Sequence, residues 1–331
     1  MMRAVDFDEP GGPEVLHLVE TAPPSAGPRD IVIEVAATAL NYADILQRRG
    51  TYGLRPGVEQ RLGLECSGRV RELGSEVSGF AIGDEVCALI PGGAYAEQVA
   101  VDASLALPVP SGVSLLDAAA LPEMAATVWS NLVDIGGLRA GHDVLVHGGS
   151  GGIGSGAIQI ARALGARVFT TCGNEEKAQE CRALGAELAI NYRTTDFVSA
   201  VHEATGGRGA DLVLDNMGAS YLERNIAVAA DDGRILTIGL QGGKLAEVNI
   251  GAMMGKRLAL HATSLRDRPL PERARIMAGV HRDLWPLVGR GELVPVVGKV
   301  FDLDDVVDAH RHAESGDAFG KTLLRIGGGD A

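Results

Sequence analysis

The chain has 331 residues, of which 46% are hydrophobic and 22% charged. This is the composition of an ordinary globular protein, long enough for about two domains of ~150 residues. The net charge of −13 argues against a nucleic-acid partner, because binding a phosphate backbone needs a basic surface. No apolar run approaches the ~18 residues of a transmembrane helix, and the N-terminus lacks a signal-like apolar segment. We therefore expect a cytoplasmic protein with no membrane partner.

The N-terminal third of the chain, to about residue 110, has the pattern of short strands separated by Gly- and Pro-rich turns. Residues 30–40 alternate between apolar and polar positions, and shorter β-rich runs follow at 67–74, 84–90 and 94–101. These runs predict a β-rich, barrel-like domain. From Ser114 the apolar residues recur at helical spacing instead, and Pro122 is expected to separate two helices.

The middle of the chain alternates between strands and helices. Helices are predicted at 151–165 and 174–186. After residue 266 we expect one helix over 271–293, and then a strand, a helix and a strand. Apolar strands joined by crossover helices indicate an α/β fold with a parallel sheet covered on both faces. The predicted strands of this sheet are 143–148, 166–172, 188–192, 211–218, 234–240 and 257–265.

A glycine-rich turn follows the first strand of this series. Gly149, Gly151 and Gly154 fit the pattern G-x-G-x-x-G and open an amphipathic helix. In that context the pattern is typical of dinucleotide-binding sites, because glycines permit close approach of a pyrophosphate and the helix N-terminus supplies N–H donors. The alternative is a glycine-rich turn that binds nothing.

The end of the second strand of the series bears on the choice between NAD and NADP. An NAD enzyme usually has Asp or Glu there, which accepts hydrogen bonds from the ribose and repels a 2′-phosphate. This chain has "CGN" at 172–174, with Lys177 one turn into the next helix and Tyr192 at the end of the next strand. These residues favour NADPH. Acidic residues at 175–176 count against it, and the alternative for Lys177 is an ordinary surface lysine.

The segment 41–53 is predicted to form a short helix and a loop. Asn41 is the expected N-cap and Gly50 the expected C-terminal stop. Asp44 and Arg48, four residues apart, are candidates for pairing with each other on the helix, with a structural or a catalytic role. Tyr52 is placed to donate a hydrogen bond to a substrate carbonyl, or to stack on a ring.

Several motifs occur in order along nearly the whole chain. They are N-x-x-D-x-x-x-R-x-G-x-Y at 41–52, G-x-E-x-x-G at 63–68, "PGGAYAEQV" at 91–99, "AAALPEMAATVWSNL" at 118–132, the glycine loop, and "FGKTLLRI" at 319–326. Together they resemble the zinc-independent quinone oxidoreductases of the medium-chain dehydrogenase/reductase superfamily. The resemblance is strongest to the tumour-suppressor-inducible quinone oxidoreductases, which are related to zeta-crystallin.

Zinc ligands are missing from the positions where the zinc alcohol dehydrogenases carry them. Tyr42 or Ala43 stands near the position of their Cys, and Leu64 replaces the His that precedes Glu65. The four cysteines are scattered and match no ligand spacing. We therefore expect no metal site and no metal-assisted alcohol oxidation.

The resemblance implies an architecture. A GroES-like β-barrel domain that carries substrate and catalytic groups is expected at 1–122, and a Rossmann domain with a doubly wound parallel sheet, which binds NADPH, at 123–266. The segment 267–331 is expected to return to the catalytic domain. A homodimer joined through the sheet edge at 257–265 is also implied.

The resemblance also implies site residues. Asn41, Tyr52 and Thr127 would be the catalytic group, with Asn41 and Thr127 beside the nicotinamide. Asn216 stands where the family usually has a small residue, so its contact is less firmly implied. Five of the eight histidines, at 147, 261, 281, 310 and 312, match no shared catalytic role, and His310 and His312 are expected at the surface. The other implied cofactor contacts are Gly149, Gly151, Gly152, Ile153, Gly154, Gly173, Lys177, Tyr192, Gly239, Leu240, Ser264, Leu265, Phe319 and Lys321.

The expected reaction is the transfer of hydride, or of single electrons, from NADPH to a quinone. Without metal or an evident proton relay, the protein would contribute mainly orientation and a dry cleft. One alternative is an NADPH-dependent reductase of α,β-unsaturated ketones, aldehydes or enoyl thioesters, for which Tyr52 is the nearby proton or hydrogen-bond donor. A remoter alternative is an NADPH-binding structural or RNA-binding protein.

Overall fold

The computed structural model describes residues 1–53 and 59–326. The chain divides into two compact units. Unit 1 comprises Met1–Ala125, Arg266–Gly289 and Pro295–Ala331, and unit 2 comprises Ala126–Leu265 and Arg290–Val294. Unit 1 is thus assembled from three separate stretches of the chain.

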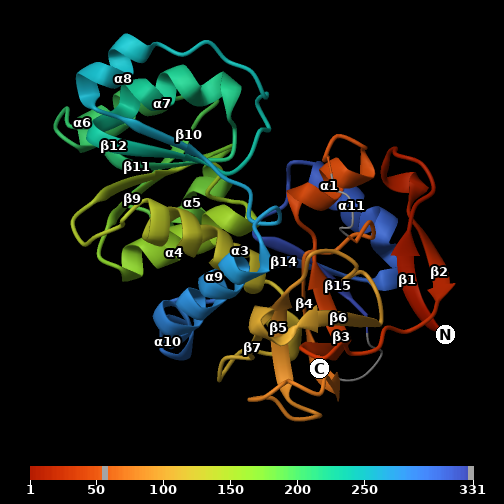
Figure 1. Cartoon of the computed structure of the whole chain (residues 1–331). Coiled ribbons are helices and arrows are strands. Elements are labelled where there is room, and N and C mark those ends of the chain that lie inside the picture. Colours follow the sequence, from red (N-terminus) through yellow and green to blue (C-terminus); the bar gives the residue numbers. More distant parts are fainter. Residues whose placement is uncertain (54–58, 327–331) are drawn as a thin grey trace. The chain divides into compact units, whose positions relative to one another are not determined.

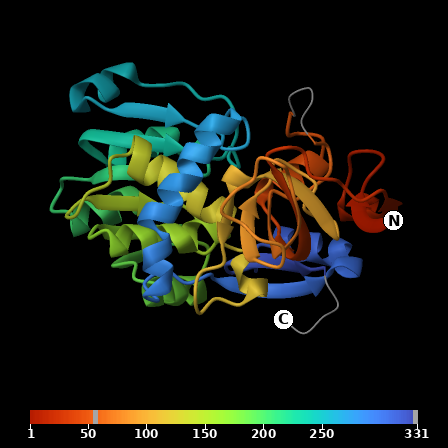
Figure 2. The ribbon, with the colours of Figure 1, turned by 60° about the horizontal axis from the view of Figure 1, so that its bottom comes forward.

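A strongly curled sheet forms the centre of unit 1. Its strands run in the order β14-β15-β3-β4-β5-β7, and β6 also pairs with β3. The C-terminal strands, blue in Figure 2, therefore lie beside strands from the start of the chain, in red and orange. The strands are β3 (Asp30–Ala39), β4 (Glu65–Leu73), β5 (Glu85–Leu89), β6 (Gln98–Asp102), β7 (Ala106–Pro108), β14 (Val297–Asp302) and β15 (Lys321–Arg325), with a separate hairpin of β1 (Met2–Asp6) and β2 (His17–Thr21).

The helices of unit 1 are short, apart from α9. The sequence predicted one helix over 271–293, but the structure has two, because the helical turns break at Leu284 before Pro286. The indole of Trp285 donates to the carbonyl of Pro108 (2.8 Å), which fixes the second helix to β7. The helices are α1 (Tyr42–Arg48), α2 (Leu115–Ala118), α9 (Leu270–Asp283), α10 (Trp285–Gly289) and α11 (Val306–Glu314), with single turns η1 (Pro13–Val15), η2 (Ala103–Leu105) and η5 (Leu303–Asp305). A further helix, α3 (Pro122–Val128), begins in unit 1 and ends in unit 2.

Unit 2 is a parallel sheet with helices on both faces, as the alternating pattern predicts. The strand order is β10-β9-β8-β11-β12-β13, which reverses direction after β8 and is that of a doubly wound fold. Figure 1 shows α6 and α7 above the sheet and α4 and α5 below it. The strands are β8 (Asp143–Val146), β9 (Arg167–Cys172), β10 (Leu188–Asn191), β11 (Ala210–Asp215), β12 (Ala229–Thr237) and β13 (Ala259–Ala262), and the helices are α4 (Gly152–Ala163), α5 (Glu175–Ala183), α6 (Phe197–Ala204), η4 (Ala219–Tyr221), α7 (Leu222–Val228) and α8 (Ile250–Lys256).

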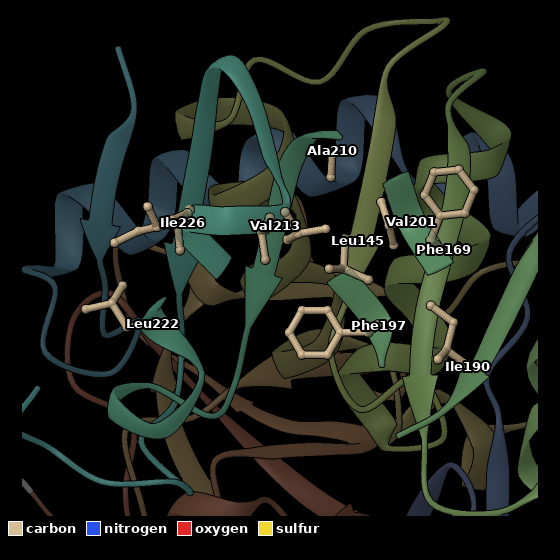
Figure 3. Close-up of a cluster of buried hydrophobic side chains, with 11 residues drawn as sticks. Leu145, Phe169, Ile190, Phe197, Val201, Ala210, Val213, Leu222 and Ile226 are labelled. Carbon is tan, nitrogen blue, oxygen red and sulfur yellow. The ribbon is translucent and has the colours of Figure 1, made fainter. Parts of the chain in front are cut away.

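The upper face of this sheet carries a well-packed core (Figure 3). Leu145 and Val213 from the central strands meet Phe197 from α6 and Ile226 from α7, all at most 4% exposed. Burying side chains of this kind contributes about 1.5–3 kcal/mol each. The core fixes the strands whose carboxyl ends carry the residues described below.

A π-helix, η3 (Trp129–Ile135), continues from α3. The wider turn leaves the carbonyl of Thr127 to side chains: Ser130 Oγ (3.2 Å) and Asn131 Nδ2 (2.9 Å) both donate to it. Such wide turns inside helices often occur at functional sites. Among the described residues, no helix combines the length and apolarity that crossing a bilayer requires.

Candidate functional site

The glycine loop between β8 and α4 has the geometry that the sequence predicts. Gly148 adopts a left-handed conformation (φ 71°), and the N–H of Gly151 closes the turn onto the carbonyl of Gly148 (3.0 Å). A Cβ on Gly154 would lie 2.2 Å from that carbonyl oxygen, and a Cβ on Gly149 would lie 2.1 Å from Thr170 Oγ1. The close packing of the loop therefore requires glycine at positions 149 and 154.

The first turn of α4 presents its N-terminal amides to this loop. Gly151 is the exposed N-cap, and Gly152 and Ile153 follow, each partly exposed. A Cβ on Gly151 would meet nothing closer than 3.5 Å, so this glycine faces open space, in contrast to its two neighbours in the motif. Open backbone at a helix N-terminus suits a phosphate group, because the N–H donors and the helix dipole both favour negative charge.

A second group of predicted residues gathers where β9 and β10 end. The two strands pair in register to Cys172 and Asn191, and the N–H of Tyr192 donates to the carbonyl of Cys172 (3.1 Å). The position that a Cβ would take on Gly173 is 3.1 Å from the hydroxyl of Tyr192. Lys177 lies in the first turn of α5, whose N-cap is Asn174. Tyr192 thus lies beside Gly173, and Lys177 lies in the first turn of the helix that follows the same strand.

The ends of β11 and β12 supply the next predicted contacts. Asp215, fully buried, accepts hydrogen bonds from the N–H groups of Met217 (2.8 Å) and Gly218 (3.1 Å) and so fixes the loop after β11. The Nδ2 atom of Asn216 lies 2.6 Å from the Cβ position of Gly148, whereas its Oδ1 atom is buried without a hydrogen-bond partner. A buried acceptor without a partner is costly unless a ligand supplies the donor.

Five further predicted contacts of unit 2 differ in exposure. Gly239 approaches the loop after β11 so closely that a Cβ would lie 2.7 Å from the carbonyl oxygen of Asn216. Leu240 is 48% exposed, and Ser264 is exposed, whereas Leu265 and Thr127 are buried. The structure therefore brings Gly239 and Asn216 to the glycine loop.

In unit 1, the side chain of Asn41 is held at both ends. Its Oδ1 accepts from Lys321 Nζ (2.6 Å), and its Nδ2 donates to Glu65 Oε1 (2.9 Å). Lys321 and Glu65 form an ion pair (2.5 Å), both nearly fully buried. The other carboxylate oxygen of Glu65 accepts from the N–H of Glu123 (2.9 Å). The amide of Asn41 therefore has one orientation, set by two charged neighbours.

The helix α1 begins and ends as predicted. Asn41 is its N-cap, Asp44 accepts from the N–H of Asn41 (2.8 Å), and Gly50 (φ 70°) follows the C-cap in the left-handed conformation. The predicted pairing of Asp44 with Arg48 is wrong, because both side chains turn inward and each has other partners. Asp44 accepts from the N–H of Gly63 (2.9 Å), and Arg48 pairs with Glu314 (2.7 Å).

The prediction that His310 lies at the surface is also wrong. Its ring is fully buried, with Nδ1 3.2 Å from Arg48 Nη1 and Nε2 3.5 Å from the hydroxyl of Tyr95. Arginine has only donors, so Nδ1 accepts and Nε2 carries the proton. Tyr95 in turn donates to Asp44 (3.4 Å). Burial lowers the pKa of His310 to about 3 and raises that of Asp44 to about 6.

Tyr52 lies beside an arginine that sequence reasoning missed. The guanidinium carbon of Arg266 is 5.6 Å from the centre of the Tyr52 ring. The same guanidinium donates to Gln47 Oε1 (2.7 Å) and to the carbonyls of Pro91 (2.8 Å) and Glu59 (3.2 Å). Arg266 thus ties three segments of unit 1 to the side of Tyr52. No motif marked it, because these partners are remote in sequence.

The remaining predictions concern Phe319, cysteine and metal ligands. Phe319 precedes β15 and is partly exposed. All four cysteines are buried and unbridged. In the part of the chain that the structure describes, His, Cys, Asp and Glu side chains nowhere gather in groups of three or more that would hold a metal ion.

The features of unit 2 fit a dinucleotide. A Cβ at Gly149 or Gly154 would overlap neighbouring protein atoms, and Gly151 at the start of α4 faces open space. Among the described residues, the Oδ1 atom of Asn216 has no hydrogen-bond partner. Doubly wound sheets bind nucleotides at the carboxyl ends of their strands, where the strand order reverses. The loop after β8 lies at that point of this sheet.

Comparison with known proteins agrees with this arrangement. Residues 27–111 match the model of the alcohol dehydrogenase GroES-like domain, and residues 152–278 that of the zinc-binding dehydrogenases. The quinone oxidoreductase of Pseudomonas aeruginosa is 32% identical over 98% of this chain and 99% of its own length. The chain therefore belongs to the zinc-independent quinone oxidoreductase family of the medium-chain dehydrogenases/reductases.

Several curated relatives are much longer, so that this chain spans about 15% of their length. The phthioceranic/hydroxyphthioceranic acid synthase of Mycobacterium tuberculosis is 31% identical over 96% of this chain, which spans only 15% of that protein. Among solved structures, Escherichia coli quinone oxidoreductase complexed with NADPH has a TM-score of 0.88 and 30% identity over 98% of this chain and 99% of its own. An NAD-dependent alcohol dehydrogenase (TM-score 0.85, 33% identity, 99% and 100% coverage) and the CurK enoyl reductase (0.87, 25%, 98% and 99%) are also similar.

Proposed function

We propose that this oxidoreductase reduces a quinone with NADPH. The glycine loop carries the proposal, because its geometry accepts a pyrophosphate and the chain belongs to the quinone oxidoreductase family. The absence of an acidic side chain at 172–174, with Tyr192 beside Gly173 and Lys177 in the first turn of α5, supports NADPH over NADH. The similar structure of E. coli quinone oxidoreductase was solved with NADPH, which supports the same choice.

When bound, NADPH supplies a hydride from its nicotinamide ring. The chain's own contribution is to bind and orient. The amides at the start of α4 hold the pyrophosphate, and the loop after β11, fixed by Asp215, keeps Asn216 beside Gly148. A quinone needs little activation, because the charge that it gains is delocalised and water can supply the proton. Orientation alone can therefore account for the catalysis.

For unit 1 we propose that Asn41 and Tyr52 serve the reacting end of the cofactor and the substrate. The amide of Asn41 is fixed by Lys321 and Glu65 and so needs no reorganisation to act. The phenol of Tyr52, beside the cation of Arg266, is a donor for a substrate oxygen. Thr127, whose carbonyl is fixed by Ser130 and Asn131, is proposed as a contact of the nicotinamide.

A second candidate reaction is the reduction of a conjugated double bond. The similarity to the CurK enoyl reductase supports it. Adding hydride to an enone places charge on the carbonyl oxygen, so a hydrogen-bond donor accelerates that step by ~10²–10⁴-fold. Tyr52 is the group in unit 1 that we propose for this role.

The two reactions are separated by following NADPH oxidation with an ortho-quinone and with an enone of similar size, for the wild type and for Tyr52→Phe. We expect faster turnover of the quinone, with Tyr52→Phe within about threefold of the wild type, because a delocalised product needs no dedicated donor. Faster turnover of the enone, together with a ~10²-fold loss in Tyr52→Phe, would establish double-bond reduction instead. Cofactor binding without turnover of either would favour a binding protein.

We further propose that two copies of the chain pair through β13. This strand is bonded to β12 on one side and ends the sheet of unit 2. Apolar side chains are exposed on it and nearby: Leu260 (39%), Ile250 (66%) and Met254 (74%). An open edge with exposed apolar residues pairs readily with another strand.

A further inference from the structure

A second basic side chain, besides Lys177, stands where β9 and β10 end. The ideal Cβ position on Gly173 is 3.9 Å from Nη2 of Arg193, and the hydroxyl of Tyr192 lies on the same side at 3.1 Å. The backbone at this point is well fixed, since the N–H of Arg193 donates to Asn191 Oδ1 (3.1 Å). The guanidinium therefore projects from an ordered turn towards the glycine.

The guanidinium of Arg193 makes no ion pair or hydrogen bond within residues 1–53 and 59–326. This is unusual in the molecule, because acidic residues outnumber basic ones by 43 to 30 and most arginines have a carboxylate partner. The exposed guanidinium of Arg193 has no carboxylate partner among the described residues although the protein has many carboxylates. It is therefore available to bind an anion from outside the protein.

The acidic residues nearby do not neutralise this position. Glu175, the first residue of α5, is paired with Arg182 on the same helix. Glu176 is exposed and has no ion pair among the described residues. The side chain of Asn174 accepts from the N–H of Lys177 (2.8 Å) and so is occupied in capping the helix. The groups that face Gly173 are thus the phenol of Tyr192 and the guanidinium of Arg193.

We propose that Arg193 binds the 2′-phosphate of NADPH together with Lys177 and Tyr192, and that it is a specificity-determining residue of the cofactor site. The inference rests on the proposed use of NADPH. A guanidinium presents a planar fork of N–H donors that matches two phosphate oxygens, whereas a lysine acts as a point charge. Arg193 would therefore supply geometry that Lys177 alone does not.

The test uses two small probes that differ only by the phosphate in question. Binding of 2′,5′-ADP and of 5′-AMP to the full chain is measured by titration calorimetry, for the wild type, Arg193→Gln and Arg193→Lys. We expect Arg193→Gln to bind 2′,5′-ADP about tenfold more weakly and 5′-AMP as well as the wild type does. Arg193→Lys should fall between them, because it keeps the charge and loses the fork.

Arg139→Gln is the matched control. Arg139 is an exposed arginine of the same unit that precedes β8, at the amino end of that strand, and its loss should change neither affinity. The proposal is overturned if Arg193→Gln binds 2′,5′-ADP as the wild type does, or loses both probes equally. If the wild type itself binds the two probes equally well, the assignment of NADPH fails, and the role of Arg193 fails with it.

Discussion

The buried polar residues of unit 1 form a chain in which each group has a defined direction of donation. Arg48 donates to His310, His310 to Tyr95, and Tyr95 to Asp44. Arginine cannot accept a hydrogen bond, so Arg48 must donate to His310. This fixes which group donates in each of the other two hydrogen bonds. All of these hydrogen bonds can form together in only one arrangement of the side chains. They therefore strongly determine how α1 packs on α11.

The buried carboxyl of Asp44 makes the stability of the protein depend on pH. Burial raises the pKa of Asp44 to about 6, above the ~3.9 of an unfolded chain. The folded state therefore holds the proton more tightly, and Asp44 lowers the free energy of unfolding as pH rises from about 4 to about 6. Relative to Asp44→Asn, the wild type should lose up to ~3 kcal/mol across this window, measured by urea unfolding.

Asp308→Asn, which changes an exposed carboxyl on α11, is the control for that measurement. Its free energy of unfolding should stay parallel to that of the wild type at every pH. If the difference in free energy of unfolding between the wild type and Asp44→Asn does not change with pH, the pKa of Asp44 is not raised as described.

At the scale of elements, the glycine loop and α4 act together. Gly154 is the third glycine of the motif, but its function is steric, since a Cβ would overlap the carbonyl oxygen of Gly148. Gly151, the second, is open and has an extended conformation that any residue can adopt. The motif thus contains two glycines, Gly149 and Gly154, that packing requires, and one, Gly151, that is required only by what approaches from outside.

Two alanine substitutions separate these roles. Gly154→Ala should distort the loop, lowering both the melting temperature and the affinity for NADPH, the latter by about tenfold or more. Gly151→Ala should leave the melting temperature unchanged, because its methyl group enters open space, and should weaken NADPH binding only. Thermal unfolding and fluorescence titration with NADPH measure the two quantities. Equal effects of both changes on the melting temperature would contradict this division.

The edge strand β13 is the element on which the proposed dimer depends. Leu260→Lys puts a charge on the exposed edge, which natural sheets use to prevent pairing. We expect the wild type to sediment as a dimer and Leu260→Lys as a monomer of unchanged melting temperature. Ile82→Lys, at an exposed apolar position of unit 1, is the control and should remain a dimer. A monomeric wild type would refute the proposal.

For the whole molecule, the decisive feature is that the sheet of unit 1 includes β15, which lies almost 300 residues after β3, the first strand of that sheet in the sequence. Strand β15 lies between β14 and β3, and its first residue, Lys321, forms the buried ion pair with Glu65 on β4. A buried pair need not stabilise more than apolar residues would, but removing one partner leaves an uncompensated charge. The ion pair therefore restricts the residue types that positions 65 and 321 can accept.

Lys321→Met should destabilise the protein by about 3–5 kcal/mol, because Glu65 then stays buried without its cation. Adding Glu65→Gln should restore much of that loss, since no charge then remains unpaired, and Gln keeps an acceptor for the N–H of Glu123. Chemical unfolding of both single variants and the double variant gives the coupling energy. Strictly additive losses would show that the two side chains do not act as a pair.

Local pattern was sufficient to predict the parts of the fold that local physics determines. The alternation of strands and helices, the glycine loop, and the two ends of α1 at Asn41 and Gly50 follow from periodicity and backbone preference over a few residues. The closeness of Gly173 and Tyr192 was predictable because parallel strands end at one edge of a sheet.

Long-range contacts were not predictable in this way. His310 is buried because it meets Arg48, 262 residues away, and the spacing of His310 and His312 contained no information about that contact. One signal was available: Val306 and Ala309, also buried, share a helical face with His310. Arg193 could have been found by its adjacency to Tyr192, whereas Arg266 offered no comparable signal.

The position of β15 also has a consequence for synthesis on the ribosome. Both stretches of unit 2, residues 126–265 and 290–294, are synthesised before the last described strand of unit 1. Until residues 321–325 leave the exit tunnel, β3 lacks one neighbour and Glu65 lacks its cation. Unit 1 can therefore complete its sheet only after residues 321–325 have emerged, and a nascent chain stalled before that point would present an unpaired strand edge to chaperones.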